Sequence, residues 1–445
     1  MRNIRVLALL LVALSAAAEE RHVVIISIDG MRPEFYLDPA SVGAEAPNLA
    51  ALLEEGACVE SVSPVFPSVT YPNHASLATG VRPARHGILA NTIFQTPRPP
   101  YWYIESRQLR VPTIWDIAYR EGMTTSAIHW PTTCGAKIDV LLPEPEYAPR
   151  SMDRMWRETV EGARPEEFIE KIEARYGEVD PKKMHHAELD RLISAATCVA
   201  IEEYKPALVL VHVLQVDGAQ HEHGRDGEEV AKAVEAADVV VGEIRASIQK
   251  AGIAGSTTIL VCGDHGFMTV TRSVRPAVAL KRAGLGGGSS KDWKVRLHVS
   301  GNQAAVYLAD PGDDALRDAA WKALEDLSEL DGKKLYRMLA RKDLDELGAN
   351  PAAAFAIAAE EGVTIDRDAS EPFVSELPSP QGNHGSHPDI QDLHTGLVLW
   401  GRGVKKGARL DAASVLDVAP TAARLLGLEM EDVDGRVLEE LLEGE

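Results

Sequence analysis

Three apolar runs in this chain each lead into an aspartate, and this pattern constrains the fold more than any other feature. The runs are short and rich in β-branched residues, and they cover residues 23–28, 207–216 and 257–262. Continuous apolar runs of this length are typical of strands buried on both faces of a parallel sheet. The carboxyl ends of parallel strands lie along one edge, where α/β enzymes build their sites. We therefore predict that three carboxylates meet at that edge, those of Asp29, Asp217 and Asp264.

Helical patterns lie between these strands, and a further strand pattern covers residues 395–400. The alternation predicts an α/β fold, with a doubly wound, mostly parallel sheet flanked by helices. Two segments interrupt it. Residues 144–186 are rich in charge and predict a cap insertion, and residues 276–380, with a Gly-rich turn and alternating runs, predict a small inserted α+β subdomain. The catalytic core then comprises residues 19–275 and 381–445.

The first 18 residues have the pattern of a secretory signal peptide, with Arg2 and Arg5 before an apolar segment that ends in small residues. We expect an exported protein, periplasmic or secreted. No later stretch is long and apolar enough to predict a membrane anchor in the mature chain. The formal net charge of −21 argues against nucleic-acid scaffold binding through a basic face. It does not exclude a small phosphate substrate, because bound metal ions can invert the local potential.

Four cysteines in a chain of 445 residues do not make a disulfide scaffold. Cys262 ends an apolar run and Cys198 lies in a helical pattern, so we expect both to be buried thiols. If a disulfide forms, we expect it between Cys58 and Cys134.

Three histidines accompany the three aspartates. His221 follows Asp217 by four residues, His265 directly follows Asp264, and His384 lies in a Gly-Asn-His-Gly segment. A single Asp after a strand is usually a helix N-cap, but three such ends, two of them with a histidine, favour a metal site. Buried like charges are costly without a counter-ion. Oxygen and imidazole ligands without cysteine suit two Zn²⁺ ions, with Mn²⁺ or Fe as alternatives.

A hydroxyl-rich segment at residues 65–80 contains the sequence Phe-Pro-Ser-Val-Thr-Tyr-Pro-Asn-His. Read alone, this segment is a turn followed by a helix cap. One further motif precedes this segment, Asp29-Gly30-x-Arg32-Pro33. Four others follow it in order: His86-Gly87-Ile88, Trp130-Pro131, Asp264-His265-Gly266 and Gly382-x-His384-Gly385. As an ordered set they resemble the nucleotide pyrophosphatase/phosphodiesterase family of the alkaline phosphatase superfamily. The resemblance covers about residues 22–440 and implies an alkaline phosphatase-like core.

The resemblance also implies a ligand set for each metal ion. One zinc ion would be held by Asp29, Thr70, Asp264 and His265. The other would be held by Asp217, His221 and His384.

The family's reaction implies roles for three neighbouring residues. Thr70 would be the nucleophile, with Ser68 as the nearest rival hydroxyl. Asn91 would donate a hydrogen bond to a phosphoryl oxygen. Tyr71 would bind substrate by stacking on the nucleobase, or would instead pack into the core.

The chain departs from the family pattern at two of these motifs. Gln220 precedes His221 where the family commonly has glycine, and Ser386-His387 follow the last His-Gly where the family has an aromatic and an acid. His387 and His394 therefore compete with His384 as ligand, and His223 competes with His221. We expect structural roles for four further residues, Arg32, His74, Arg82 and Arg85.

These features predict a metal-dependent phosphodiesterase or pyrophosphatase that acts on nucleotides or related small diesters through a threonine phospho-enzyme intermediate. One alternative is a phosphomonoesterase or phosphonate hydrolase on the same two-metal scaffold. Another is a metal-stabilised binding protein without activity, which the retention of Thr70 and all six ligand positions argues against.

Overall fold

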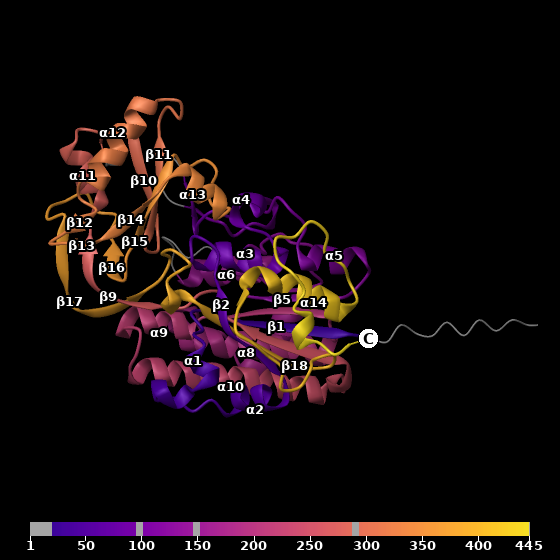
Figure 1. Ribbon diagram of the computed structural model, residues 1–445. Helices are drawn as coiled ribbons and strands as arrows, with labels where there is room; N and C mark the ends of the chain where they lie inside the picture. Colours follow the sequence, from indigo (N-terminus) through magenta and orange to yellow (C-terminus); the bar gives the residue numbers. More distant parts are fainter. Residues whose placement is uncertain (1–19, 95–100, 146–151, 287–292, 445) are drawn as a thin grey trace, which may run out of the picture.

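The computed structural model describes residues 20–94, 101–145, 152–286 and 293–444, and the predicted signal peptide lies outside them. A mixed nine-stranded sheet forms the centre of the molecule (Figure 1). Its strands lie in the order β19–β2–β18–β8–β1–β7–β5–β6, with β20 paired to β2. Their bounds are β1 His22–Ile28, β2 Ala57–Ser63, β5 Thr125–Ile128, β6 Val140–Leu142, β7 Leu208–Val213, β8 Thr257–Cys262, β18 Thr395–Gly401, β19 Arg409–Leu410 and β20 Ala413–Ser414.

Helices cover both faces of this sheet. Side chains alternate between the faces along each strand, so the apolar residues of one strand contact helices on both sides. In β1, Val24 and Ile26 face α1 Glu34–Leu37, α2 Pro47–Glu55, α7 Phe168–Tyr176, α8 His186–Tyr204 and α10 Glu228–Lys250. Val23 and Ile25 face α3 Thr70–Thr79, α5 Ile114–Arg120 and α14 Val418–Leu426. The arrangement confirms the predicted α/β fold class.

A second unit lies beside the core, at the upper left of Figure 1. Its antiparallel sheet has the order β10–β11–β15–β14, with bounds Val295–Ser300, Gln303–Leu308, Phe355–Ala359 and Tyr336–Leu339. Apolar residues of α11 Pro276–Arg282 and α12 Asp314–Glu325 pack on it, and α13 Arg341–Glu346 lies at its edge. A smaller sheet has the order β16 Gly362–Ile365, β9 Met268–Val274, β17 Val374–Asn383.

Two strands carry the chain into and out of this unit. β9 begins two residues after Gly266, and β17 ends directly before His384. They pair antiparallel, with Asn383 opposite Met268. This register brings His384 beside His265 although the two residues are far apart in the sequence. The division of the chain at residues 276 and 380 stays a prediction.

Two of the expected strands differ from their predicted form. The run at residues 207–216 is a strand only to Val213, and Asp217 lies instead in the first turn of α9 Gln215–His223. The run looks continuous because Val216 in the helix is as buried as the strand residues. β18 is antiparallel to its neighbours β2 and β8, so the sheet is mixed rather than wholly parallel.

The remaining helices and short strands connect these layers. They are α4 Pro83–His86, α6 Met152–Gly162, β3 Thr92–Ile93, β4 Tyr101–Trp102, β12 Glu329–Leu330 and β13 Lys333–Lys334. The predicted cap at residues 144–186 includes α6 and α7, and residues 146–151 of it lie outside the described residues. Among the helices of the described ranges, none combines the length and hydropathy that a membrane span requires.

All four cysteines are free thiols, so the expectation of a Cys58–Cys134 disulfide is wrong. Cys58 is buried in β2, in the central sheet, where it pairs with β18. Cys134 donates a hydrogen bond to the carbonyl oxygen of Glu144. Cys198 and Cys262 are buried thiols as predicted.

Helix α2 depends on a capping carboxylate from another helix. Its own N-cap residue, Ala46, has no side-chain acceptor. The buried carboxylate of Asp238 in α10 instead accepts from the backbone N–H groups of Asn48 at 3.1 Å and Leu49 at 2.7 Å. This contact joins α2 to α10 across 190 residues of sequence.

We predict that Asp238→Ala lowers the free energy of unfolding by about 1–3 kcal/mol, because two buried backbone donors lose their acceptor. Urea unfolding monitored by circular dichroism measures this. The matched control is Glu235→Ala. Glu235 lies one turn earlier on α10, and its carboxylate accepts from the backbone N–H of Glu45 in an exposed contact. This substitution should change the free energy of unfolding by less than about 0.5 kcal/mol. Equal effects of the two substitutions would refute the capping role.

Candidate active site

The carboxyl edge of the sheet brings the first group of predicted ligands together. Asp29 follows β1, and Asp264 and His265 follow β8. Asp29 is 3% exposed, and the other two residues are fully buried. His265 Nε2 lies 3.4 Å from Asp29 Oδ1 and 3.2 Å from Asp264 Oδ2. Ligand atoms on one zinc ion are separated by about 3.3–3.5 Å, given bond lengths near 2.0–2.2 Å and tetrahedral geometry. These three side chains therefore fit a shared ion.

A second group adjoins the first. His221 Nε2 lies 3.1 Å from His384 Nε2 and 3.5 Å from Asp217 Oδ1, because residues four apart lie on one face of α9. His384 Nε2 lies 3.6 Å from Asp217 Oδ1. The ring of His384 stacks on that of His265, with centroids 3.6 Å apart. His265 therefore belongs to both groups, whereas the sequence placed it in one.

Backbone carbonyls set the tautomers of two of these histidines. His265 Nδ1 donates to the carbonyl oxygen of Gly266 at 3.2 Å, and His384 Nδ1 donates to that of Ser68 at 3.0 Å. Each ring then presents an unprotonated Nε2 to the carboxylates. Metal-ligating histidines are usually oriented in this way through their second nitrogen.

Unsatisfied polar atoms point to a cation at this place. Within the described residues, Asp29 Oδ1, Asp217 Oδ1, Asp264 Oδ2 and His265 Nε2 are buried without a hydrogen-bond partner. Such atoms are rare in native proteins, and each calls for an explanation. A pair of metal ions bound between these side chains would satisfy all four. The residues present therefore fit the metals that the sequence pattern predicts.

The electrostatics of the group support the same reading. Burial raises the pKa of Asp29 well above its ordinary range, and the charges of Asp264 and Asp217 raise it further. Burial also raises the pKa of Asp264. Burial lowers the pKa of His265 strongly and that of His384 to about 4, so both imidazoles are neutral. Without cations the site holds protons on its carboxyl groups, and cations would displace them.

Thr70 is the first residue of α3 and is half-buried. His74, one turn later, donates from Nδ1 to the carbonyl oxygen of Thr70 at 2.9 Å, and the same Nδ1 lies 3.6 Å from Asp264 Oδ2. The start of α3 is thus joined to the carboxylate group. The rival hydroxyl, Ser68, is fully buried and donates to the carbonyl oxygen of Ser386. Sequence reasoning gave His74 only a structural role, and its contact with Asp264 is visible only in the fold.

Asn91 lies beside the start of α3. Its Oδ1 accepts from the backbone N–H of Tyr71 at 3.0 Å, and its own backbone N–H donates to Ser300 Oγ at 3.3 Å. The first contact orients the amide so that Nδ2 is the donor left for a ligand at the helix start. Ser300 comes from the inserted unit, which therefore helps to hold Asn91.

The inserted unit also approaches His384 directly. Asn302 donates from its backbone N–H to the carbonyl oxygen of His384 at 2.8 Å. Gly301 has φ +59°, and a Cβ there would lie 2.6 Å from the same carbonyl oxygen. Only glycine fits this turn between β10 and β11 without displacing His384.

Tyr71 is placed differently from the stacking expectation. Its ring is 1% exposed and packs against Trp102, with centroids 5.2 Å apart. Ala75 and Ile88 complete this small apolar cluster. The burial does not agree with a ring face open to a nucleobase, and it favours packing, the alternative that the sequence left open.

The rival histidines lie outside the ligand groups. His387 pairs with Asp389 at 2.7 Å, His394 contacts Ser61 at 2.6 Å, and His223 lies beside Glu222.

The unusual Gln220 is fully buried and donates to the carbonyl oxygen of Gly30 at 2.9 Å, so it joins α9 to the turn after β1.

Two of the three arginines expected to be structural form ion pairs, and the third makes a backbone hydrogen bond. Arg32 pairs with Asp226 at 2.9 Å, and Arg85 pairs with Asp432 and Asp434. Arg82 donates from its backbone to Asp434.

The fold thus places carboxylates and imidazoles that could hold metal ions at the carboxyl edge of an α/β sheet. A family model described as type I phosphodiesterase/nucleotide pyrophosphatase matches residues 23–387. The chain therefore belongs to that family, as its motifs predicted, and the family is one of enzymes.

Known relatives agree with this membership. An uncharacterized pyrophosphatase/phosphodiesterase of Schizosaccharomyces pombe is 27% identical over 254 residues, which are 55% of this chain and 44% of the relative. Ectonucleotide pyrophosphatase/phosphodiesterase family member 1 of Rattus norvegicus is 23% identical over 57% of this chain and 24% of its own length. The alignments thus span less than half of these two relatives.

A longer match, over 93% of this chain and 79% of the relative, is to bis(5'-adenosyl)-triphosphatase enpp4 of Mus musculus, at 20% identity. Among solved structures, human ENPP5 superposes with a TM-score of 0.69 at 19% identity, covering 95% of this chain and all of that one. This likeness establishes the fold.

We predict that Zn²⁺ binding at pH 6.5 releases about one or two protons per chain, because the raised pKa values of Asp29 and Asp264 leave carboxyl protons to be displaced. The pKa of Asp264 is about 8, so affinity should rise with pH up to about that value and release should be small at pH 9. Calorimetric titration in buffers of different ionisation enthalpy measures it. Asp264→Asn should release fewer protons. Heats that do not depend on the buffer at pH 6.5 would contradict the prediction.

Proposed function

We propose that this protein hydrolyses phosphodiester or phosphoanhydride bonds in nucleotides or related small diesters, with Thr70 as nucleophile and two Zn²⁺ ions as cofactors. One observation carries the proposal. Six metal-ligand side chains from β1, α9, β8 and the end of β17 converge beside the start of α3, which bears Thr70. Bound ions would supply positive charge that favours the threonine alkoxide and neutralises the phosphoryl oxygens.

The roles of the chain's own residues follow from their places. Thr70 Oγ attacks phosphorus in line with the leaving oxygen; the Thr70 O–P bond forms as the bond to the leaving group breaks. Water then hydrolyses the Thr70 ester and regenerates the hydroxyl. Asp29, Asp264 and His265 would hold one ion, and Asp217, His221 and His384 the other, with Thr70 completing the first set. His384 and His265 would bind through their unprotonated Nε2 atoms.

Asn91 would donate from Nδ2 to a non-bridging phosphoryl oxygen. Its Oδ1 is already engaged by the backbone of Tyr71, which orients the donor toward the helix start. The N-terminus of the ten-residue helix α3 adds a partial positive charge there. A neutral amide donor suits the single negative charge of a diester better than the higher charge of a monoester.

The comparisons support nucleotides as the substrate class. A structural neighbour, murine ENPP5, has been solved as an inactive threonine-to-alanine variant in complex with AMP. A relative of Mus musculus is named as a bis(5'-adenosyl)-triphosphatase. These are properties of those proteins, and they make a nucleotide diester the first substrate to test here.

We predict that Thr70→Ala lowers kcat by about 10⁴-fold or more on a nitrophenyl nucleotide diester, because the reaction loses its nucleophile. Thr70→Ser should keep part of the activity. The matched control is Ser68→Ala, which removes a buried hydroxyl two residues earlier and should keep most of it. If Thr70→Ala stays active and Ser68→Ala is inactive, the nucleophile is Ser68 and not Thr70. In the same assay, faster turnover of nitrophenyl phosphate or phosphonoacetate by the unaltered protein would favour the monoesterase or phosphonate alternative.

We expect Tyr71→Ala to raise KM about equally for the nucleotide diester and for bis-nitrophenyl phosphate, because the ring packs beneath the helix start instead of facing a base. Initial rates on the two substrates measure this. A loss confined to the nucleotide, by about 5- to 150-fold, would restore the stacking role, since base–aromatic stacking contributes about 1–3 kcal/mol.

A further inference from the structure

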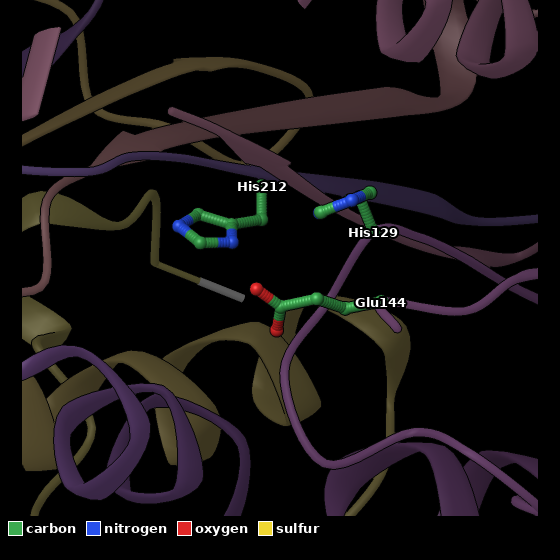
Figure 2. A group of neighbouring side chains, drawn as sticks. All are labelled: His129, Glu144 and His212. Atoms are coloured by element: carbon green, nitrogen blue, oxygen red, sulfur yellow. The ribbon is translucent and has the colours of Figure 1, made fainter. Parts of the chain in front are cut away.

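A third group of side chains that could hold a metal ion lies outside the two ligand groups of the candidate active site. It consists of His129, Glu144 and His212, drawn in Figure 2. His129 follows β5, Glu144 follows β6 by two residues, and His212 lies within β7. One ligand atom of each lies within 4.8 Å of the others, and all three residues are at least 97% buried. In Figure 2 the carboxylate of Glu144 points toward the ring of His212, with His129 on its other side.

His212 is held in the tautomer that a metal ligand needs. Its Nε2 lies 3.1 Å from Asp29 Oδ2, and this contact is a hydrogen bond that Nε2–H donates. Its Nδ1 is then unprotonated. It is buried, faces Glu144, and has no hydrogen-bond partner among the described residues. A carboxylate that accepts from one nitrogen while the other nitrogen faces a ligand group is the arrangement of the carboxylate–histidine–metal triad.

The other two donors suit the same ion. Burial lowers the pKa of His129 to about 3, so its imidazole is neutral. Two imidazoles and one carboxylate make a His₂Glu set, which proteins use for Zn²⁺ with one position open to water. Mg²⁺ and Ca²⁺ prefer sets made of oxygen.

We propose that His129, Glu144 and His212 bind a third divalent ion of the zinc class, separate from the catalytic pair. His212 would connect the third ion to the catalytic pair. It would ligate the third ion through Nδ1 and donate a hydrogen bond through Nε2 to Asp29. An ion on Nδ1 makes Nε2–H a stronger donor, so it holds Asp29 ionised and oriented for the catalytic pair. The third ion is thus a positioning element for that pair, and it does not contact substrate.

The direct test is the place and number of zinc ions. Crystals of the full chain soaked in Zn²⁺ should show an anomalous peak among His129, Glu144 and His212, in maps recorded above but not below the zinc edge. Solutions analysed by mass spectrometry after removal of loosely bound metal should contain three ions per chain. A peak at this place supports the third site even if the catalytic pair is empty, so failure of the proposed function and failure of this inference are distinguishable.

Variants separate this site from its neighbour. His129→Gln and Glu144→Gln each remove one proposed ligand of the third ion, so each variant should bind one ion fewer than the unaltered protein. The control is His22→Gln, which removes a buried histidine from the other end of β1. There, Nδ1 of His22 donates to the carbonyl oxygen of Pro206. This variant should bind as many zinc ions as the unaltered protein. In His129→Gln, affinity of the remaining ions should fall by about 10- to 100-fold, the usual effect of losing an outer ligand partner.

Several outcomes would overturn the inference. They are a zinc-soaked crystal without density at this group, an unaltered protein whose count matches that of His129→Gln, or a His22→Gln protein that loses the same ion. Any of these would mean that the three side chains form only a buried polar contact. The crystal experiment uses the unaltered protein, so it decides the question even if a variant fails to fold.

Discussion

Two buried carboxylates, those of Asp29 and Asp264, lie close together with the partly buried Asp217 beside them, and the rest of the site is built around this concentration of negative charge. Asp29 and Asp264 lie in the interior, where an isolated charge is costly. The fold places neutral histidines between them and fixes two of those rings through backbone carbonyls. Within the described residues, several of their oxygen and nitrogen atoms have no hydrogen-bond partner, as expected of side chains that could hold cations.

The inserted unit contributes to this site as well as the core does. β9 and β17 are its connecting strands, and their pairing delivers His384 to the stacking position on His265. The turn between β10 and β11 then contacts both His384 and Asn91. A proposed metal ligand and the proposed phosphoryl donor therefore both contact this part of the insertion, and this links its packing to the geometry of the proposed reaction.

Much of this could be predicted from the sequence, because strand ends carry a strong local signal. Residues 257–262 form a strand with the predicted bounds, and the acids after β1 and β8 meet as expected. Asp217 was expected directly after a strand, but it lies in the first turn of α9, because a buried helix turn continues the apolar run of β7. The rank of His384 above His387 rested on resemblance, and only the antiparallel register of β17 gives a physical reason for it.

The third group of side chains left no such signal. His212 lies in β7, whereas His129 and Glu144 follow two other strands, β5 and β6, and no sequence spacing joins the three; only the histidine within the apolar run of β7 was unusual. The burial of Tyr71 was hidden for a related reason, since it depends on Trp102, which comes from a separate strand. Local pattern thus predicts which residues lie at a sheet edge, while contacts between distant segments decide which side chains face the site.

The proposed function requires this edge of the sheet to assemble a phosphoryl-transfer centre around Thr70. Acid quenching of the zinc-loaded protein during turnover of a nucleotide diester, followed by peptide mass spectrometry, tests it most directly. The account predicts a nucleotidyl adduct on the peptide from the start of α3, with fragment ions that place it on Thr70. An adduct on Ser68 or on a histidine, or turnover that continues in Thr70→Ala without any adduct, would contradict it.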